Sequence, residues 1–182
     1  MRQGMFKRFE LRAATCAAIL CFAATALNAQ MQQWKTYSYS TEGFSASFPS
    51  EPEAQKRNVD TQAGPFELRS YIVQNEAAAL FVGICDYGEK VAGADPDLQL
   101  QNAKDGALQN SNSHLISEGK LTLGIYHGLR FESESDSAYF SARIYMIGTS
   151  LYQTLVVTPK GKRYPDEARF LDSFQLIPRT SN

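Results

Sequence analysis

The stretch LRFESES, which begins at Leu129, restricts the possible fold more than any other feature of the chain. Apolar or small side chains at its odd positions alternate with charged ones at its even positions, the pattern of a strand with one buried face. If an even-length turn follows at Asp136–Ser137, apolar residues of the next strand meet this buried face. The expected pairs are Leu129 with Ile144, Phe131 with Ala142, Ser133 with Phe140, Glu132 with Ser141 and Glu134 with Tyr139. The pattern therefore predicts an antiparallel hairpin.

Similar alternation, together with turn residues, predicts strands over most of the remaining chain. A strand in GFSASFPSEP ends at its prolines, and three strands joined by tight turns are expected between residues 54 and 88. The last of these, Leu80–Cys85, is apolar at nearly every position, as expected of a strand that is covered on both faces. Strand periodicity returns from His114 to Thr158, with breaks near Gly124, Gly128, residues 135–137 and Gly148–Thr149.

Two segments change to helical spacing. The first opens with Asp95, which can cap a helix, and with Pro96, which suits the first helical position. Its apolar stripe consists of Leu100, Ala103, Ala107 and Leu108, and Gly106 weakens it by about 1 kcal/mol relative to alanine. The second segment opens at Pro165 and carries Ala168, Leu171 and Phe174 on one side. The order of strands, helix, strands and helix predicts an α+β fold, with an antiparallel β-sheet flanked by helices.

The N-terminal residues have the pattern of a secretory signal, with four basic residues before an apolar run over residues 13–26. The run is shorter than the roughly 20 residues of a membrane-spanning helix, so we expect cleavage after Ala26 or Ala29 and no stable membrane span. Bulky residues precede Cys16 and Cys21, which disfavours lipidation. We therefore expect residues 1–29 to be a signal peptide and residues 30–182 a single α+β domain, exported to the periplasm or the extracellular space.

The charge balance gives no electrostatic reason to expect nucleic acid as a partner. Removal of residues 1–29 takes away four basic residues and one acidic residue, which leaves 14 Lys/Arg and 18 Asp/Glu, a net charge of −4. The remaining chain keeps one cysteine, Cys85, in the apolar run LFVGICDY. We interpret it as a buried, inert thiol, because a nucleophile needs an electropositive setting and a histidine.

The motifs of the common catalytic classes are missing from the chain. It contains no Gly-x-Ser-x-Gly elbow, no phosphate-binding loop, no His-Glu-x-x-His and no Cys-x-x-Cys. Its two histidines, His114 and His127, are thirteen residues apart and offer no recognisable metal-ligand spacing. We interpret His127 as a turn residue beside Gly128, and we expect neither a catalytic residue nor a cofactor.

Three acidic residues of the predicted hairpin, Glu132, Glu134 and Asp136, share one strand face and are the candidate metal ligands. If they converged at the hairpin tip, they would form a weak calcium site. The favoured interpretation is a solvated face that Arg130 and Arg143 neutralise through cross-strand pairs worth roughly 0.2–1 kcal/mol. A candidate anion site lies in the turn PKGKR, where the basic residues are Lys160, Lys162 and Arg163. Charges in such turns are most often simply solvated.

Two alternative functions follow from other combinations of residues. A small envelope hydrolase would use Glu132 or Glu134 together with His127 in a concave pocket. A small-ligand binder would line its site with aromatic residues, for which the candidates are Tyr71, Tyr87, Tyr145 and Tyr152. Tyrosines at such positions more often fill half-buried places in a sheet.

The order of several segments is similar to that of the PsbP-like α/β/α sandwich family of envelope and thylakoid-lumen accessory proteins. The segments are GFSASFPSEP, DPDLQLQNAKDGALQ, LGIYHGLRFE, ARIYMIGTSLYQTLVV and FLDSFQL. The chain has His127–Gly128 where a typical member has Pro-Gly before the arginine-bearing strand. The resemblance implies a binding or assembly module without a catalytic apparatus. Our hypothesis is therefore a secreted or periplasmic, non-enzymatic accessory module with a protein partner in the cell envelope.

Overall fold

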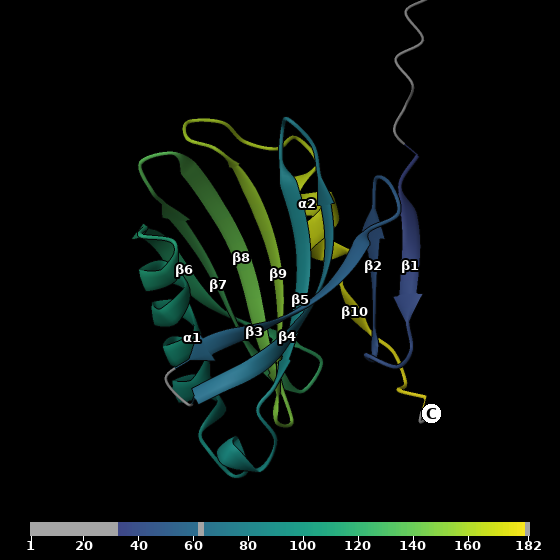
Figure 1. Cartoon of the computed structure of the whole chain (residues 1–182), viewed down its shortest axis with the longest axis vertical. Helices are drawn as coiled ribbons and strands as arrows, with labels where there is room; N and C mark the ends of the chain where they lie inside the picture. Colours follow the sequence, from purple (N-terminus) through teal and green to yellow (C-terminus); the bar gives the residue numbers. More distant parts are fainter. Residues whose placement is uncertain (1–32, 62–63, 181–182) are drawn as a thin grey trace, which may run out of the picture. The chain divides into compact units, whose positions relative to one another are not determined.

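In the computed structural model, which describes residues 33–61 and 64–180, seven strands form one antiparallel sheet in the order β3-β4-β5-β9-β8-β7-β6 (Figure 1). Their bounds are β3 Glu53–Thr61, β4 Gly64–Gln74, β5 Ala79–Asp86, β6 His114–Leu123, β7 Tyr126–Glu134, β8 Ala138–Ile147 and β9 Ser150–Pro159. Within the same residues, β1 Lys35–Tyr39, β2 Phe44–Phe48 and β10 Gln175–Leu176 form a second sheet with β2 in the middle. The predicted α+β class with antiparallel strands is confirmed.

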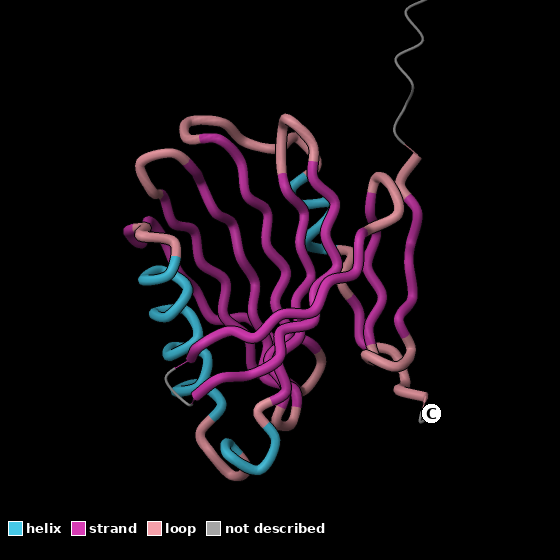
Figure 2. The backbone as a smooth tube through the Cα atoms, in the orientation of Figure 1, coloured by secondary structure: helices cyan, strands magenta, loops and turns pink. Residues whose placement is uncertain are grey.

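The helices lie on opposite sides of the large sheet. Figures 1 and 2 show α1 (Pro96–Asn110) along one face, packed on β7 and β8, and α2 (Glu167–Asp172) on the other side, next to the small sheet. A short 3₁₀ helix, η1 (Gly88–Val91), leads from β5 towards α1. As predicted, Pro96 opens α1, and the Asp95 side chain accepts a hydrogen bond of 2.9 Å from the backbone N–H of Asp97. This capping hydrogen bond fixes the start of α1 at Pro96.

The hairpin of β7 and β8 has the predicted register. Leu129 pairs with Ile144, Phe131 with Ala142, Ser133 with Phe140, Glu132 with Ser141 and Glu134 with Tyr139. The side chains of Leu129, Phe131 and Ser133 are buried under α1, and the intervening residues point to the opposite face. The alternation therefore defines which face of the large sheet each side chain occupies.

One hydrophobic core lies between the large sheet, the small sheet and α2. Phe44 and Phe48 of β2 are fully buried, and Phe174 stacks on Tyr145 with ring centroids 5.7 Å apart. Phe170 of α2 packs against Phe48 at 5.2 Å. This aromatic cluster joins the two sheets on the side away from α1.

A second core lies beneath α1 on the other face of the large sheet. Leu100 of α1 packs with Leu129, Phe131 and Ile144 of β7 and β8. Lys104 is also buried on this side of the helix, where its ammonium group lies 2.7 Å from a carboxylate oxygen of Glu118. The helix is thus held by a small apolar contact and by ionic contacts to the outer strands.

The C-terminal helix is shorter than its pattern predicted. α2 ends at Asp172, so Phe174 follows the helix, and Ala168 is exposed and does not belong to its apolar face. The chain leaves the helix because Gln175–Leu176 pairs with β2 as strand β10. The sequence pattern did not predict this pairing, nor the separate small sheet that it completes.

Gly128 is not the turn residue that was predicted. The turn lies at Gly124–Ile125, and both His127 and Gly128 belong to β7, where Gly128 pairs with Tyr145 of β8. The predicted signal peptide, residues 1–29, lies outside the described residues. Within the part of the chain that the structure describes, no helix is long and apolar enough to cross a membrane.

Candidate functional site

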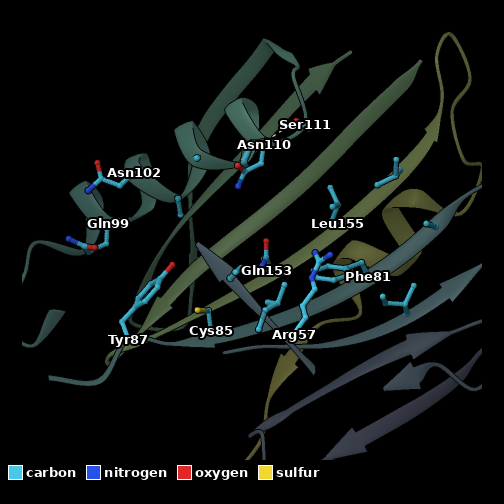
Figure 3. A pocket seen from close by; sticks show the side chains of 18 of the residues that line it. Arg57, Phe81, Cys85, Tyr87, Gln99, Asn102, Asn110, Ser111, Gln153 and Leu155 are labelled. Atoms are coloured by element: carbon cyan, nitrogen blue, oxygen red, sulfur yellow. Dashed lines mark hydrogen bonds between the residues drawn. The ribbon is translucent and has the colours of Figure 1, made fainter. Parts of the chain in front are cut away.

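A cavity of about 500 Å³ lies between α1 and the strands β3, β4, β5 and β9 (Figure 3). It exists because α1 packs on β7 and β8 and leaves the half of the same sheet face that β3, β4 and β5 form without a helix above it. The β3–β4 hairpin extends towards α1 on this side (Figure 1). Ligand pockets in proteins have volumes of roughly 300–1,000 Å³. The cavity is therefore large enough for a small molecule.

The floor of the cavity is apolar and comes from cross-strand neighbours. Ile72, Phe81 and Leu155 lie side by side on β4, β5 and β9, because Phe81 pairs with both of the others. The remaining apolar floor residues are Val59, Leu68, Ala79, Cys85 and Val157. The alternate residues of β5, such as Leu80 and Val82, are buried in the aromatic core on the other face. The unbroken apolar run of β5 thus serves a core on one face and a cavity on the other.

The wall opposite the floor is formed by α1 and consists of small and amide side chains. Gln99, Asn102, Gly106 and Asn110 recur at helical spacing along it, with Ala103 and Ala107 beside them. A Cβ placed on Gly106 would have no other atom within 4 Å. Gly106 therefore faces open space, and the small residues that resembled a packing stripe in the sequence make room for the cavity.

Two further residues shape the middle of the floor. A Cβ on Gly83 would lie 2.5 Å from the ring of Phe81 and 3.0 Å from the amide nitrogen of Gln153, so the absence of a side chain lets both groups lie over this position. The amide of Gln153 makes no hydrogen bond with any of the described residues. A polar group in an apolar floor is thus left for water or a ligand.

The cavity contains no activated nucleophile among the described residues. Burial raises the pKa of the Cys85 thiol to about 11, with the neighbouring Arg69 charge as a smaller, opposing effect. Burial also raises the pKa of Tyr87, whose ring packs edge-on against Phe66 at 4.8 Å. The Cys85 thiol is protonated at neutral pH, which agrees with its interpretation as an inert residue.

Comparison with known proteins identifies the architecture. No family model matches the chain, and no curated protein matches it. Among solved structures, the chain is similar to the solution structure of cyanobacterial PsbP (CyanoP) from Synechocystis sp. PCC 6803, with a TM-score of 0.54 over 82% of this chain and 95% of that chain. The fold is PsbP-like. The sequence identity is 12%, so the similarity defines the fold alone.

The candidate metal ligands lie away from the cavity. Glu132 and Glu134 are on the opposite face of the large sheet, and each has a basic partner. A carboxylate oxygen of Glu132 lies 3.5 Å from the Arg163 guanidinium, and one of Glu134 lies 3.2 Å from the Lys160 ammonium. Asp136 is exposed at the hairpin tip. Among the described residues, no three Asp, Glu, His or Cys side chains are grouped closely enough to hold a metal ion. The structure therefore does not bring Glu132, Glu134 and Asp136 together around one point.

Two basic residues of the PKGKR turn, Lys160 and Arg163, are therefore the partners of the acidic hairpin, in place of the predicted Arg130 and Arg143. Arg163 also stacks on the Tyr139 ring, with its guanidinium carbon 3.6 Å from the ring centroid, and donates a hydrogen bond to the Tyr139 hydroxyl. Lys162 is exposed beside them. The predicted partner Arg143 instead forms an ion pair of 2.5 Å with Asp172 of α2. The charge balance of this face is set by segments that are distant in sequence.

The residues of the hydrolase alternative are separated by the sheet. Nδ1 of His127 is hydrogen-bonded to Oδ1 of Asp97 at 2.7 Å, on the α1 side of β7. Glu132 and Glu134 lie on the opposite side of the same strand. Hydrogen bonds from Lys120 and then from His127 hold the pKa of Asp97 below its usual value. His127 thus connects β7 with the start of α1, and it shares no pocket with either glutamate.

Of the four candidate tyrosines, Tyr87 alone lines the cavity. Tyr71, Tyr145 and Tyr152 belong to the aromatic core on the other face. Sequence reasoning missed most of the cavity residues, because the floor pattern is also that of a buried strand. One sequence signal pointed to the cavity. Gly106, Ala103 and Ala107 lie on the buried side of α1, where a packed helix would carry larger apolar residues.

Proposed function

We propose that this chain is an exported, non-enzymatic binding module that holds a small, mainly apolar molecule in the cavity beside α1. The observation that carries the proposal is the cavity itself, with an apolar floor on one side and amide side chains on the other. Pockets that combine an apolar lining with a few polar groups are the usual sites of small-molecule binding. The raised pKa of the Cys85 thiol and the separation of His127 from the glutamates support a role without catalysis.

Filling the cavity tests the proposal without disturbing the fold. In the Gly106→Leu variant the new Cβ enters open space, and leucine is a good helix former, whereas glycine costs a helix about 0.8–1.0 kcal/mol relative to alanine. We expect the neutral apolar dye N-phenyl-1-naphthylamine to fluoresce strongly with the wild-type protein and at least tenfold more weakly with this variant. The free energy of unfolding should stay equal or rise.

The matched control is Gln109→Leu, which adds the same side chain at an exposed position of α1 that does not line the cavity. This variant should bind the dye like the wild-type protein. Equal fluorescence from the wild-type protein and Gly106→Leu would show that the dye binds elsewhere, and the proposal would be abandoned.

Export is the second part of the proposal, and the basic and apolar pattern of the first 29 residues supports it. Expression of the full chain in a Gram-negative host should release a protein into the periplasm that begins after Ala26 or Ala29. Mass spectrometry of the periplasmic fraction measures this start directly. A full-length protein retained in the cytoplasm would contradict export.

A protein partner in the cell envelope is the second candidate function. The observation that favours it is the edge strand β6, on which Leu115 and Ile116 are 38% and 49% exposed at a register shift of the β6–β7 pairing. Immobilised wild-type protein should then retain an envelope protein in stoichiometric amount, and an Ile116→Lys variant should not. Equal retention by both would argue against this edge as the contact.

A further inference from the structure

The charges around the cavity are distributed unevenly. Among the described residues that line it, Arg57 carries the one formal charge, and no carboxylate is present. The chain from residue 30 onwards has a net charge of −4, so the lining has the opposite sign to the chain as a whole. A site with this sign favours a negatively charged group over a positively charged one.

Arg57 differs from the neighbouring basic residues in having no acidic partner among the described residues. Lys56, the preceding residue of β3, points to the other face of the sheet, where its ammonium group lies 3.7 Å from Glu67. Arg69 on that face pairs with Glu42 at 2.9 Å. Arg57 lies on the cavity side, opposite Leu68, and Figure 3 shows its side chain directed towards Phe81. Its guanidinium is therefore available to a ligand.

Neutral hydrogen-bonding groups surround the same space. The amides of Gln99, Asn102 and Asn110 project from α1 (Figure 3), and Gln153 belongs to the floor, where it pairs with Gly83. Amides can donate hydrogen bonds to the oxygens of an anionic group and carry no charge that would repel it. The apolar area of Ile72 and Leu155 remains for a hydrocarbon body. The lining thus combines groups suited to an anion with a floor suited to an apolar chain or ring.

We propose that the ligand of the cavity is a small amphiphile with a single anionic head group of the carboxylate type. Arg57 binds the head group through charge-assisted hydrogen bonds, and the apolar body lies on the floor formed by Ile72, Phe81 and Leu155. Because Arg57 is exposed in the free protein, only part of its hydration is lost on binding. The inference rests on the proposed function and adds the chemical class of the ligand.

Three probes that share one hydrocarbon chain test the head group. Isothermal titration calorimetry with decanoate, decan-1-ol and decylammonium should give the tightest binding for decanoate and the weakest for decylammonium. The two ionic probes are kept below their micelle concentrations and decan-1-ol below its solubility limit. In the Arg57→Gln variant, decanoate affinity should fall about tenfold, as expected for loss of a hydrogen bond to a charged group. The affinity for decan-1-ol should not change. Circular dichroism confirms that the variant is folded.

The matched control is Lys56→Gln, which removes a basic residue next to Arg57 from the opposite face of β3. It should leave the affinity for all three probes unchanged, and Gly106→Leu should abolish decanoate binding. Equal affinities for decanoate and decan-1-ol, or an Arg57→Gln variant that binds decanoate normally, would overturn the ligand class and leave the proposed function standing. Failure of all three probes to bind would contradict the proposed function itself.

Discussion

At Gly128 the backbone of β7 passes between two side chains of neighbouring strands. A Cβ at this position would lie 2.5 Å from Cδ1 of Leu121 and 2.7 Å from Cδ1 of Tyr145. Tyr145 is buried and stacked on Phe174, so its ring cannot move away easily. The glycine is thus required by close packing, and its backbone conformation is one that any residue adopts.

Replacement of Gly128 by alanine should therefore destabilise the protein. We expect Gly128→Ala to lower the free energy of unfolding by about 1–3 kcal/mol, the usual cost of overpacking a core. Urea unfolding followed by circular dichroism measures the change. Gly119→Ala is the matched control, because the nearest atom to its new Cβ is Nε of Arg130 at 3.0 Å, on a flexible side chain that can shift. Equal stability of the two variants would refute this account of Gly128.

At the scale of one element, α1 is bound to the sheet by charged contacts as well as by the apolar contact of Leu100 with β7 and β8. Its buried residues are Leu100 and Lys104, and the apolar residues expected to form its stripe partly line the cavity. Asp97 at its first turn contacts Lys120 of β6 at 2.5 Å and His127 of β7 at 2.7 Å. The position of the helix above the cavity thus depends on ionised groups.

This arrangement predicts an acid-dependent loss of stability. The pKa of Asp97 is lowered in the folded protein, first by the hydrogen bond from Lys120, so its contribution is complete above the ordinary value of 3.8 and is lost as the pH falls through the folded pKa. Urea unfolding at several pH values should show the wild-type protein more stable than Asp97→Asn at neutral pH. The difference should disappear well below pH 3.8. Asp136→Asn, at the exposed hairpin tip, should match the wild-type protein throughout.

At the scale of the whole molecule, the core that joins the two sheets is rich in buried phenols. Burial is the first cause of the raised pKa of Tyr71, Tyr145 and Tyr164, and it raises the pKa of Tyr39 to about 12. A raised pKa means that the folded state favours the neutral phenol. Stability from these groups is therefore complete below pH 10.0 and is lost as the pH rises towards 12.

Alkaline unfolding should follow from this core. We expect the free energy of unfolding to fall steeply above pH 10, with tyrosinate absorbance and loss of circular dichroism changing together. A Tyr39→Phe variant should lose less stability over the same range, because one titrating group is removed. Tyrosinate formation that is complete before the circular dichroism changes would contradict burial of these side chains.

Local sequence determined the strand register and the helix start, because each depends only on residues that are close together in the chain. The alternation from Leu129 onwards specified the register of β7 with β8, because a shift by one residue would have exposed every apolar side chain. Asp95 and Pro96 specified the start of α1 for a similar reason, since capping acts within one turn. The order of these elements was enough to predict the α+β class.

The features that only the tertiary structure decided depend on residues far apart in the chain. Glu132 pairs with Arg163 and Arg143 pairs with Asp172, because the turn after β9 and the end of α2 come to lie over this face of the sheet. The cavity likewise needs β3, β5, β9 and α1 together, and a strand that lines a cavity has the same alternation as a strand in a core. The sequence by itself determined the pairing and the buried faces, whereas the packing of distant elements decided where a face is left uncovered.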